Sequence, residues 1–153
     1  MAIKSIFHIN VNCSDHARSK AFYELLGFQS VFEIPEGTDP GMCRGLGLPG
    51  GTRARASIMM LDPNDQRSCR LDLIEWTDPP TEGQPYPSLT HAGAARIALF
   101  TTDLNAEYER LRAEGVEFIS EPVRMGTAAD FVCFRDPDGT VLELIDLYRP
   151  ESR

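Results

Sequence analysis

The residue types that most often do chemistry are sparse in this chain of 153 residues. No two of its cysteines have the spacing of a zinc knuckle or a redox pair, so we expect reduced thiols that are buried or half buried. The four are Cys13, Cys43, Cys69 and Cys133. Among the histidines, His8 lies in a short strand-like stretch, whereas His16 and His91 lie in turn-like sequence, where we expect them to be exposed. A histidine on a strand can act as a base, a metal ligand or a plain hydrogen-bonding group.

Two carboxylates occupy equivalent places in two similar segments. Asp72 is the third residue of RLDLIEW (70–76), and Glu143 is the third residue of VLELIDL (141–147). His8 and Arg96 match in the same way, because residues 7–33 align without a gap on residues 95–121. The chain therefore places a base, a cation and two carboxylates at corresponding positions of an internal repeat.

The repeat predicts the elements that position these residues. Each copy has a strand, side-chain oxygens that can cap a helix start, and a glycine suited to a left-handed helix end. These are Ile6–Val11, Ser14 or Asp15 and Gly27 in the first copy, and Ile97–Thr101, Thr102 or Asp103 and Gly115 in the second. Apolar stripes at helical spacing are expected at Ala17, Ala21, Phe22 and Leu25, and at Leu104, Tyr108 and Leu111. Neither half can bury both faces of a sheet alone, so we predict an α+β fold of two tandem βαβββ modules, residues 1–80 and 90–149, forming one domain over 1–149.

An insertion separates the two copies. The offset between them falls from 88 residues at the first strand to 71 at the last, so the first copy carries 17 extra residues. We place them in 37–55, which is rich in glycine and proline and lacks periodicity. This long loop is a candidate lid over a cavity.

At this point the chain resembles the vicinal oxygen chelate superfamily, which includes glyoxalases, extradiol dioxygenases and bleomycin resistance proteins. The resemblance rests on a tight turn that leads into an inward-facing glutamate, and on three further segments. The turn is Phe134–Gly139, followed by Leu142–Leu144, and the three further segments are His8–Val11, Ala21–Phe28 and Arg96–Leu99. It implies a glyoxalase-like fold in which the two modules form a curved mixed sheet around a cavity for a small molecule.

The resemblance also implies which residues line the site. Enzymes of the family hold a divalent metal with four inward positions, which correspond here to His8, Asp72, Arg96 and Glu143. Three of these are competent ligands for iron, manganese, nickel or zinc. Arginine neither deprotonates nor coordinates, and its charge repels a cation, whereas most metal-dependent members have histidine at the place of Arg96.

Two interpretations of Arg96 follow. It can form a structural bridge to Asp72 and Glu143 in place of a metal, or it can anchor an anionic ligand, and we favour either over a metal held by the three remaining ligands. The favoured function is a small-molecule-binding protein without a metal cofactor, either sequestering a hydrophobic or aromatic metabolite or antibiotic or catalysing with His8 or Glu143 as the base. The alternative is a lyase, isomerase or dioxygenase that binds one divalent metal ion through His8, Asp72 and Glu143.

Strand parity completes the predicted lining. With a period of two, Asp72 shares its face with residues two and four positions on, while Glu75 points away. The inward residues are Asn10, Asn12, Ile74, Trp76, Ala98, Phe100 and Ile145. A formal net charge of −8 disfavours nucleic acid and membrane partners. We expect a cytoplasmic homodimer, since the first ten residues lack the apolar run of a secretion signal and exposed sheet edges favour pairing.

Overall fold

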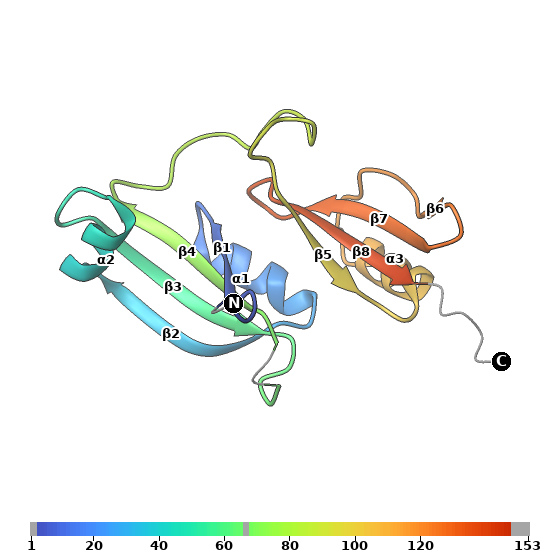
Figure 1. Ribbon diagram of the computed structural model, residues 1–153, viewed down its shortest axis with the longest axis horizontal. Helices are drawn as coiled ribbons and strands as arrows, with labels where there is room; N and C mark the ends of the chain where they lie inside the picture. The colour runs from blue at the N-terminus through green and yellow to red at the C-terminus, as the bar shows by residue number, and fades with distance from the viewer. Residues whose placement is uncertain (1–2, 66–67, 148–153) are drawn as a thin grey trace. The chain divides into compact units, whose positions relative to one another are not determined.

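The computed structural model describes residues 3–65 and 68–147, which fall into two compact units, Met1–Gly83 and Gln84–Arg153. Each unit is built around a four-stranded mixed sheet (Figure 1). Both have the βαβββ order, and the first carries one additional helix, so the predicted α+β fold of two tandem modules is confirmed. The outermost residues of the predicted modules, 1–2 and 148–149, lie outside the described residues.

The first unit has the strand order β1-β4-β3-β2. Strands β1 and β4 are parallel, and the other neighbours are antiparallel. Its elements are β1 (His8–Asn12), α1 (His16–Leu25), β2 (Gln29–Gly37), α2 (Pro40–Leu46), β3 (Arg53–Met60) and β4 (Arg70–Asp78).

The second unit repeats this plan with the order β5-β8-β7-β6. Its elements are β5 (Arg96–Phe100), α3 (Leu104–Ala113), β6 (Val123–Met125), β7 (Ala129–Arg135) and β8 (Val141–Leu147). The register repeats as well: Asn10 pairs with Asp72 between β1 and β4, as Ala98 pairs with Glu143 between β5 and β8. The duplication inferred from the sequence therefore extends to individual strand partners.

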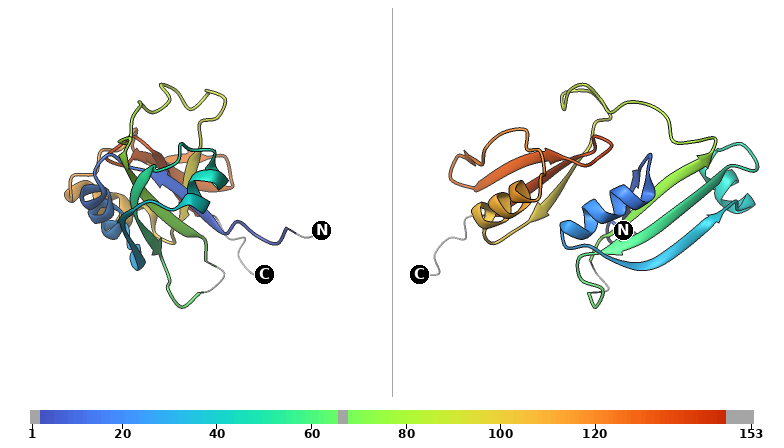
Figure 2. Two further views of the ribbon diagram at one scale, coloured as in Figure 1. Left: turned by 90° about the vertical axis from the view of Figure 1, so that its left-hand side faces the viewer. Right: turned by 180° about the vertical axis from the view of Figure 1, so that it is seen from behind.

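One face of each sheet packs on its helix. The view from behind shows α1 and α3 each lying against its own sheet (Figure 2). Asp15 and Asp103 cap the two helices by accepting hydrogen bonds from Arg18 N and Ala106 N, and the chain leaves each helix through a glycine with positive φ, at Gly27 and Gly115. The most deeply buried side chains on these faces are Tyr23, Met59, Leu73, Leu111, Val132, Phe134 and Leu142. The opposite face of each sheet, which carries neither α1 nor α3, is the helix-free face and is available for a site.

The apolar stripe predicted for the first helix is wrong at its two alanines, whereas Phe22 and Leu25 are half-buried. Ala17 and Ala21 are exposed, and the residues of α1 that are fully buried are Ser19 and Tyr23. The Tyr23 ring packs edge-on against Phe28 and is fully buried. In α3 the predicted stripe is confirmed at Leu104 and Leu111, which are both buried.

The predicted loop 37–55 is also not a plain loop. It contains α2, which Asp39 caps by accepting from Met42 N and which ends at Gly47 with positive φ. Cys43 on this helix is buried, and residues 53–55 already belong to β3. Of the cysteines, Cys69 is exposed, whereas the other three are buried as expected. No helix in the described residues has the length and apolar character needed to cross a membrane.

Candidate functional site

The helix-free face of the first sheet carries a histidine paired with a carboxylate. His8 on β1 and Asp72 on β4 point to the same side, and His8 Nδ1 lies 3.0 Å from Asp72 Oδ2. His8 is exposed, while Asp72 is half-buried. The two groups form an ion pair when the imidazole is protonated.

Asp72 is satisfied at one oxygen only. Its Oδ1 is buried, and no described residue gives it a hydrogen-bond partner. A buried carboxylate oxygen without a partner is costly, because it has lost its water and gained nothing in return. Asp72 therefore has one buried oxygen without a polar partner beside His8.

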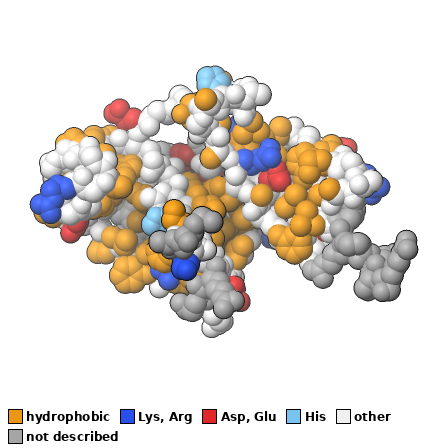
Figure 3. All heavy atoms as spheres, viewed as in Figure 1, with side chains coloured by type: hydrophobic (Ala, Val, Ile, Leu, Met, Phe, Trp, Pro, Cys, Tyr) orange, Lys and Arg blue, Asp and Glu red, His pale blue; other side chains and the backbone are white. Residues whose placement is uncertain are grey.

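The rest of this face combines amides with apolar surface. Asn12 accepts a hydrogen bond of 3.0 Å from the indole Nε1 of Trp76, which fixes the ring. Asn10 lies between His8 and Asn12 on β1 and is exposed. Two large apolar side chains of β2, Phe32 and Ile34, are exposed too. Figure 3 shows hydrophobic side chains exposed on the side of each unit seen in Figure 1.

The second sheet carries a different pair at the equivalent place. Arg96 Nε on β5 lies 2.7 Å from Glu143 Oε2 on β8. The Glu143 side chain is 7% exposed and that of Arg96 is 45% exposed, so a nearly buried carboxylate meets a guanidinium that reaches solvent. The contact is a close ion pair that offsets the burial of Glu143.

Cys133 on β7 completes this cluster, and sequence analysis did not single it out. Its thiol donates a long contact of 3.9 Å to the same oxygen, Glu143 Oε2. Burial raises the pKa of the Cys133 thiol, the charge of Glu143 raises it further, and Arg96 opposes the shift. The thiol is thus held protonated. Its place could have been read from the repeat, since Cys133 pairs with Glu143 as Ile58 pairs with Asp72.

Further along this face, Ala98 and Phe100 of β5 are exposed and Ile145 of β8 is half-buried. The two charged pairs belong to separate units, each with its own partners. Arg96 contacts Glu143, one of the two carboxylates of the predicted bridge. Asp72 contacts His8 within its own unit. The alternate residues Leu71, Leu73 and Leu142 of these strands are buried.

Comparison with known proteins fixes the family. The profile of the Glyoxalase/Bleomycin resistance protein/Dioxygenase superfamily matches residues 5–144. The chain belongs to this superfamily. It is 33% identical to the uncharacterized protein YwkD of Bacillus subtilis over 95% of this chain and 99% of that protein. It is 27% identical to the uncharacterized protein YaeR of Escherichia coli over 95% of this chain and 98% of that protein.

Solved structures of the superfamily share the fold. A glyoxalase family protein from Bacillus cereus matches with a TM-score of 0.83 at 18% identity, covering 97% of this chain and 99% of its own. TnmS3, an antibiotic binding protein from Streptomyces, matches with a TM-score of 0.63 at 25% identity, and the match covers 97% of this chain and 99% of TnmS3. The glyoxalase-like fold expected from the sequence motifs is therefore confirmed.

The superfamily's metal chemistry can be tested against the donors on each sheet. Around Glu143, a divalent ion would lie beside a guanidinium 2.7 Å from the carboxylate, and like charges repel strongly in a partly buried site. Those residues do not fit a metal ion. His8 and Asp72 offer two donors, and the described residues contain no group of three His, Cys, Asp or Glu side chains arranged to hold one.

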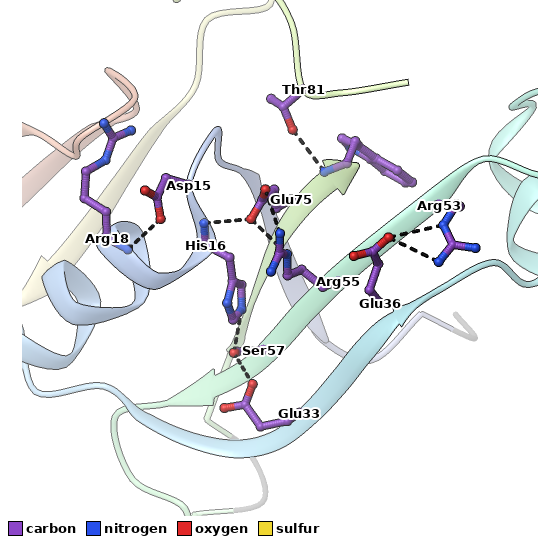
Figure 4. Close-up of polar contacts among 11 residues, drawn as sticks. Asp15, His16, Arg18, Glu33, Glu36, Arg53, Arg55, Ser57, Glu75 and Thr81 are labelled. Carbon is purple, nitrogen blue, oxygen red and sulfur yellow. Dashed lines mark hydrogen bonds and ion pairs between the residues drawn. The ribbon is translucent and has the colours of Figure 1, made fainter. Parts of the chain in front are cut away.

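A second polar cluster, on the helix side of the first sheet, was missed by sequence reasoning (Figure 4). His16 Nε2 lies 2.8 Å from Ser57 Oγ, and the buried Ser57 donates to Glu33 Oε2 at 2.6 Å. The backbone N–H of His16 also donates to Glu75, which pairs with Arg55. His16 is therefore half-buried rather than exposed as expected, because it ties the start of α1 to the sheet.

Glu33 is the acidic end of this cluster. Partial burial acts to raise its pKa, but hydrogen bonds from Lys20, Ser30 and Ser57 and the charge of Lys20 outweigh burial and lower the pKa to about 2. The cluster faces away from His8 and Asp72, so its role is to hold α1 in place. Glu75, expected to point away from the site, also belongs to it.

Proposed function

We propose that this protein binds a hydrophobic or aromatic small molecule on the helix-free faces of its sheets without a metal cofactor. The observation that carries the proposal is the 2.7 Å contact between Arg96 Nε and Glu143 Oε2. Glu143 stands where the superfamily resemblance implies a metal ligand, and here its charge is already balanced by a guanidinium. A metal would have to displace Arg96 and expose a carboxylate that is now nearly buried.

The surroundings support an organic ligand. Ala98 and Phe100 on β5, like Ile74 and Trp76 on β4, present apolar surface beside a few polar groups, which is the usual make-up of a small-molecule site. The Arg96 side chain is 45% exposed, so its guanidinium can reach negative charge on a ligand. The antibiotic binding protein TnmS3, which shares the fold, supports sequestration, and His8 or Glu143 as a base supports metal-free catalysis.

One observation favours the alternative, a metal-dependent lyase, isomerase or dioxygenase. Asp72 Oδ1 has no partner among the described residues, and a cation would satisfy it. The three-ligand set of His8, Asp72 and Glu143 would then bind iron, manganese, nickel or zinc. This set requires Glu143 to be released from Arg96.

Metal content separates the two functions. The protein is purified without chelator and its metals are quantified by elemental analysis, alongside Arg96→His and Arg96→Lys. In the unmodified protein and in Arg96→Lys, we expect only trace metal, less than about one tenth of a metal ion per protein chain. In Arg96→His, which adds an imidazole ligand, we expect about one metal ion per chain. Stoichiometric metal in the unmodified protein would overturn the proposal.

Sequestration and catalysis are separated by a screen of aromatic natural products. Binding measured by calorimetry without any change of the compound by mass spectrometry supports sequestration, and turnover supports catalysis. A homodimer and a cytoplasmic location remain part of the proposal, and light scattering of the purified protein tests the first.

A further inference from the structure

We infer that the second sheet binds an elongated organic acid. Its carboxylate lies at Arg96 and Arg135, and its apolar chain runs along the helix-free face toward Phe100. The inference deepens the proposed function and rests on it, because it needs Glu143 to be paired with Arg96 and free of metal. All of its evidence comes from the second unit.

Two arginines lie in one row across three strands of this sheet. Val141 on β8 pairs with Arg96 on β5 and with Arg135 on β7. Paired residues of neighbouring strands point to the same face, and the face of this row is the helix-free one, since the intervening Phe134 and Leu142 are fully buried. Strands lie about 4.8 Å apart, so the two arginines start roughly 10 Å from each other. Their long stems let both guanidinium groups meet one carboxylate above Val141.

Both arginines are held in place and reach solvent. Arg96 Nε lies 2.7 Å from Glu143 Oε2, and the Arg96 side chain is 45% exposed. Arg135 is exposed too, and its Nη1 donates to the backbone oxygen of Gly139 at 3.0 Å. In the described part of the chain, Arg135 has no acidic partner at ion-pair distance. Its charge is therefore left for a ligand.

The charges on this face match a ligand with one negative charge. Of the described strand residues that point to it, Glu143 is the one acid, because Asp130 and Asp146 pair with each other on the opposite face. Two guanidinium groups and one carboxylate leave a single net positive charge. A ligand carboxylate neutralises it, whereas a doubly charged phosphate would add excess negative charge to a protein whose net charge is already −8.

The row next to the arginines leaves room for the ligand to pass. In the strand register, Glu143 lies between Ala98 and Cys133. The Glu143 side chain is 7% exposed and Cys133 is 8% exposed, so neither protrudes from the surface. A chain that leaves the arginines can therefore cross this row without meeting a bulky group.

The far end of the face is apolar. One row of apolar side chains crosses all four strands in register. Its members are Phe100, Ile145, Phe131 and Val123. Phe100 is 55% exposed, and the exposed Leu147 and Met125 lie beyond this row. Figure 3 shows a basic and an acidic side chain at one end of this sheet and hydrophobic side chains beside them.

The distance between the two ends sets the length of the ligand. Phe100 follows Arg96 by four residues on the same strand, which corresponds to about 13 Å. An acid with a chain of that length places its carboxylate at the arginines and buries its tail on the apolar row. A short acid leaves the apolar row exposed to water.

The test compares decanoate, decanamide and decylammonium by isothermal titration calorimetry at neutral pH. These compounds share a ten-carbon chain and carry a negative, a neutral and a positive head. We expect one decanoate per chain, bound roughly tenfold more tightly than decanamide, as for a hydrogen bond to a charged group. Decylammonium should bind more weakly than the amide, because the guanidinium groups repel it. Butanoate should bind more than about a hundredfold more weakly than decanoate, since each buried methylene adds to the affinity.

Variants assign the head group. In Arg135→Met the preference for decanoate over decanamide should disappear, because methionine keeps apolar length without the charge. Arg135→Lys keeps a charge and should retain the preference, so a folding defect in Arg135→Met does not decide the outcome. Arg124→Met is the matched control, since Arg124 pairs with Asp130 on the opposite face, and it should leave the preference at about tenfold. Phe100→Ser should weaken both compounds alike.

An unchanged preference for decanoate in a folded Arg135→Met, or a preference lost in Arg135→Lys, contradicts the inference. So does a protein that binds no decanoate, including one in which light scattering shows that a second copy of the chain covers this face. Metal analysis of the same preparation judges the proposed function separately. Stoichiometric metal overturns the proposed function, whereas a metal-free protein that binds no decanoate overturns the inference alone.

Discussion

Replacing Arg96 by methionine tests the balance of charge at Glu143. Methionine keeps most of the apolar length of the side chain and removes the guanidinium. Losing one partner of a fully buried ion pair costs about 3–5 kcal/mol, and losing one of an exposed pair costs less than about 1 kcal/mol. Here the carboxylate is 7% exposed and the guanidinium 45%, so we expect a loss of about 2 kcal/mol.

A matched control exists on the first sheet. Arg53 pairs with Glu36 at 3.1 Å, and its side chain is 44% exposed, almost as much as that of Arg96. Glu36 is 43% exposed, so Arg53→Met should cost less than about 1 kcal/mol. Adding Glu143→Gln to Arg96→Met should recover part of the loss, because a neutral amide costs less to bury than a lone carboxylate.

Thermal and urea unfolding followed by circular dichroism measure these differences. About 2 kcal/mol corresponds to a fall in melting temperature of roughly 4–8 °C for a chain of this size. If Arg96→Met were no more destabilising than Arg53→Met, the carboxylate of Glu143 would not depend on Arg96, and the reasoning would fail.

Three further predictions concern the helix-side cluster and the cysteines. Because the folded-state pKa of Glu33 is about 2 rather than the usual 4.5, its stabilisation is present above about pH 4.5 and is lost as the pH falls to about 2. Because the Glu33 side chain is half exposed, we expect Glu33→Gln to be about 1 kcal/mol less stable than the unmodified protein at neutral pH, as measured by urea unfolding. This difference should vanish near pH 2, and a difference that does not change with pH would contradict the prediction. Ser57→Ala removes the link between His16 and Glu33 and should cost about 1–3 kcal/mol in urea unfolding, and a neutral effect would mean that the cluster does not hold α1. Iodoacetamide should label the exposed Cys69 well before Cys133, because burial and Glu143 raise the pKa of the Cys133 thiol. Peptide mass spectrometry measures the two labelling rates, and equal rates would argue against the buried position of Cys133.

The repeat made most of the fold predictable. The gapless alignment located β1 and β5, a second alignment located β4 and β8, and capping aspartates and glycines marked both ends of α1 and α3. Strand parity then assigned His8 and Asp72 to the face opposite α1, because alternation has a fixed period of two. These inferences succeeded since each depends on local chemistry.

Long-range contacts were out of reach in the same sequence. α2 is a short helix rich in glycine, so its apolar periodicity is too weak to see, although Asp39 followed by proline was a usable signal for its start. His16 seemed unremarkable because its partner Ser57 lies 41 residues away. The repeat put Asp72 and Glu143 at matching strand positions, but the division into His8–Asp72 and Arg96–Glu143 depends on side-chain geometry within each sheet.

A crystal structure of the protein purified without chelator, with data collected at the absorption edges of iron, nickel and zinc, tests the central claim most directly. The account predicts Arg96 paired with Glu143, His8 paired with Asp72, and no anomalous peak at either carboxylate. A full-occupancy metal ion ligated by His8, Asp72 and Glu143, with Arg96 turned away, would contradict it.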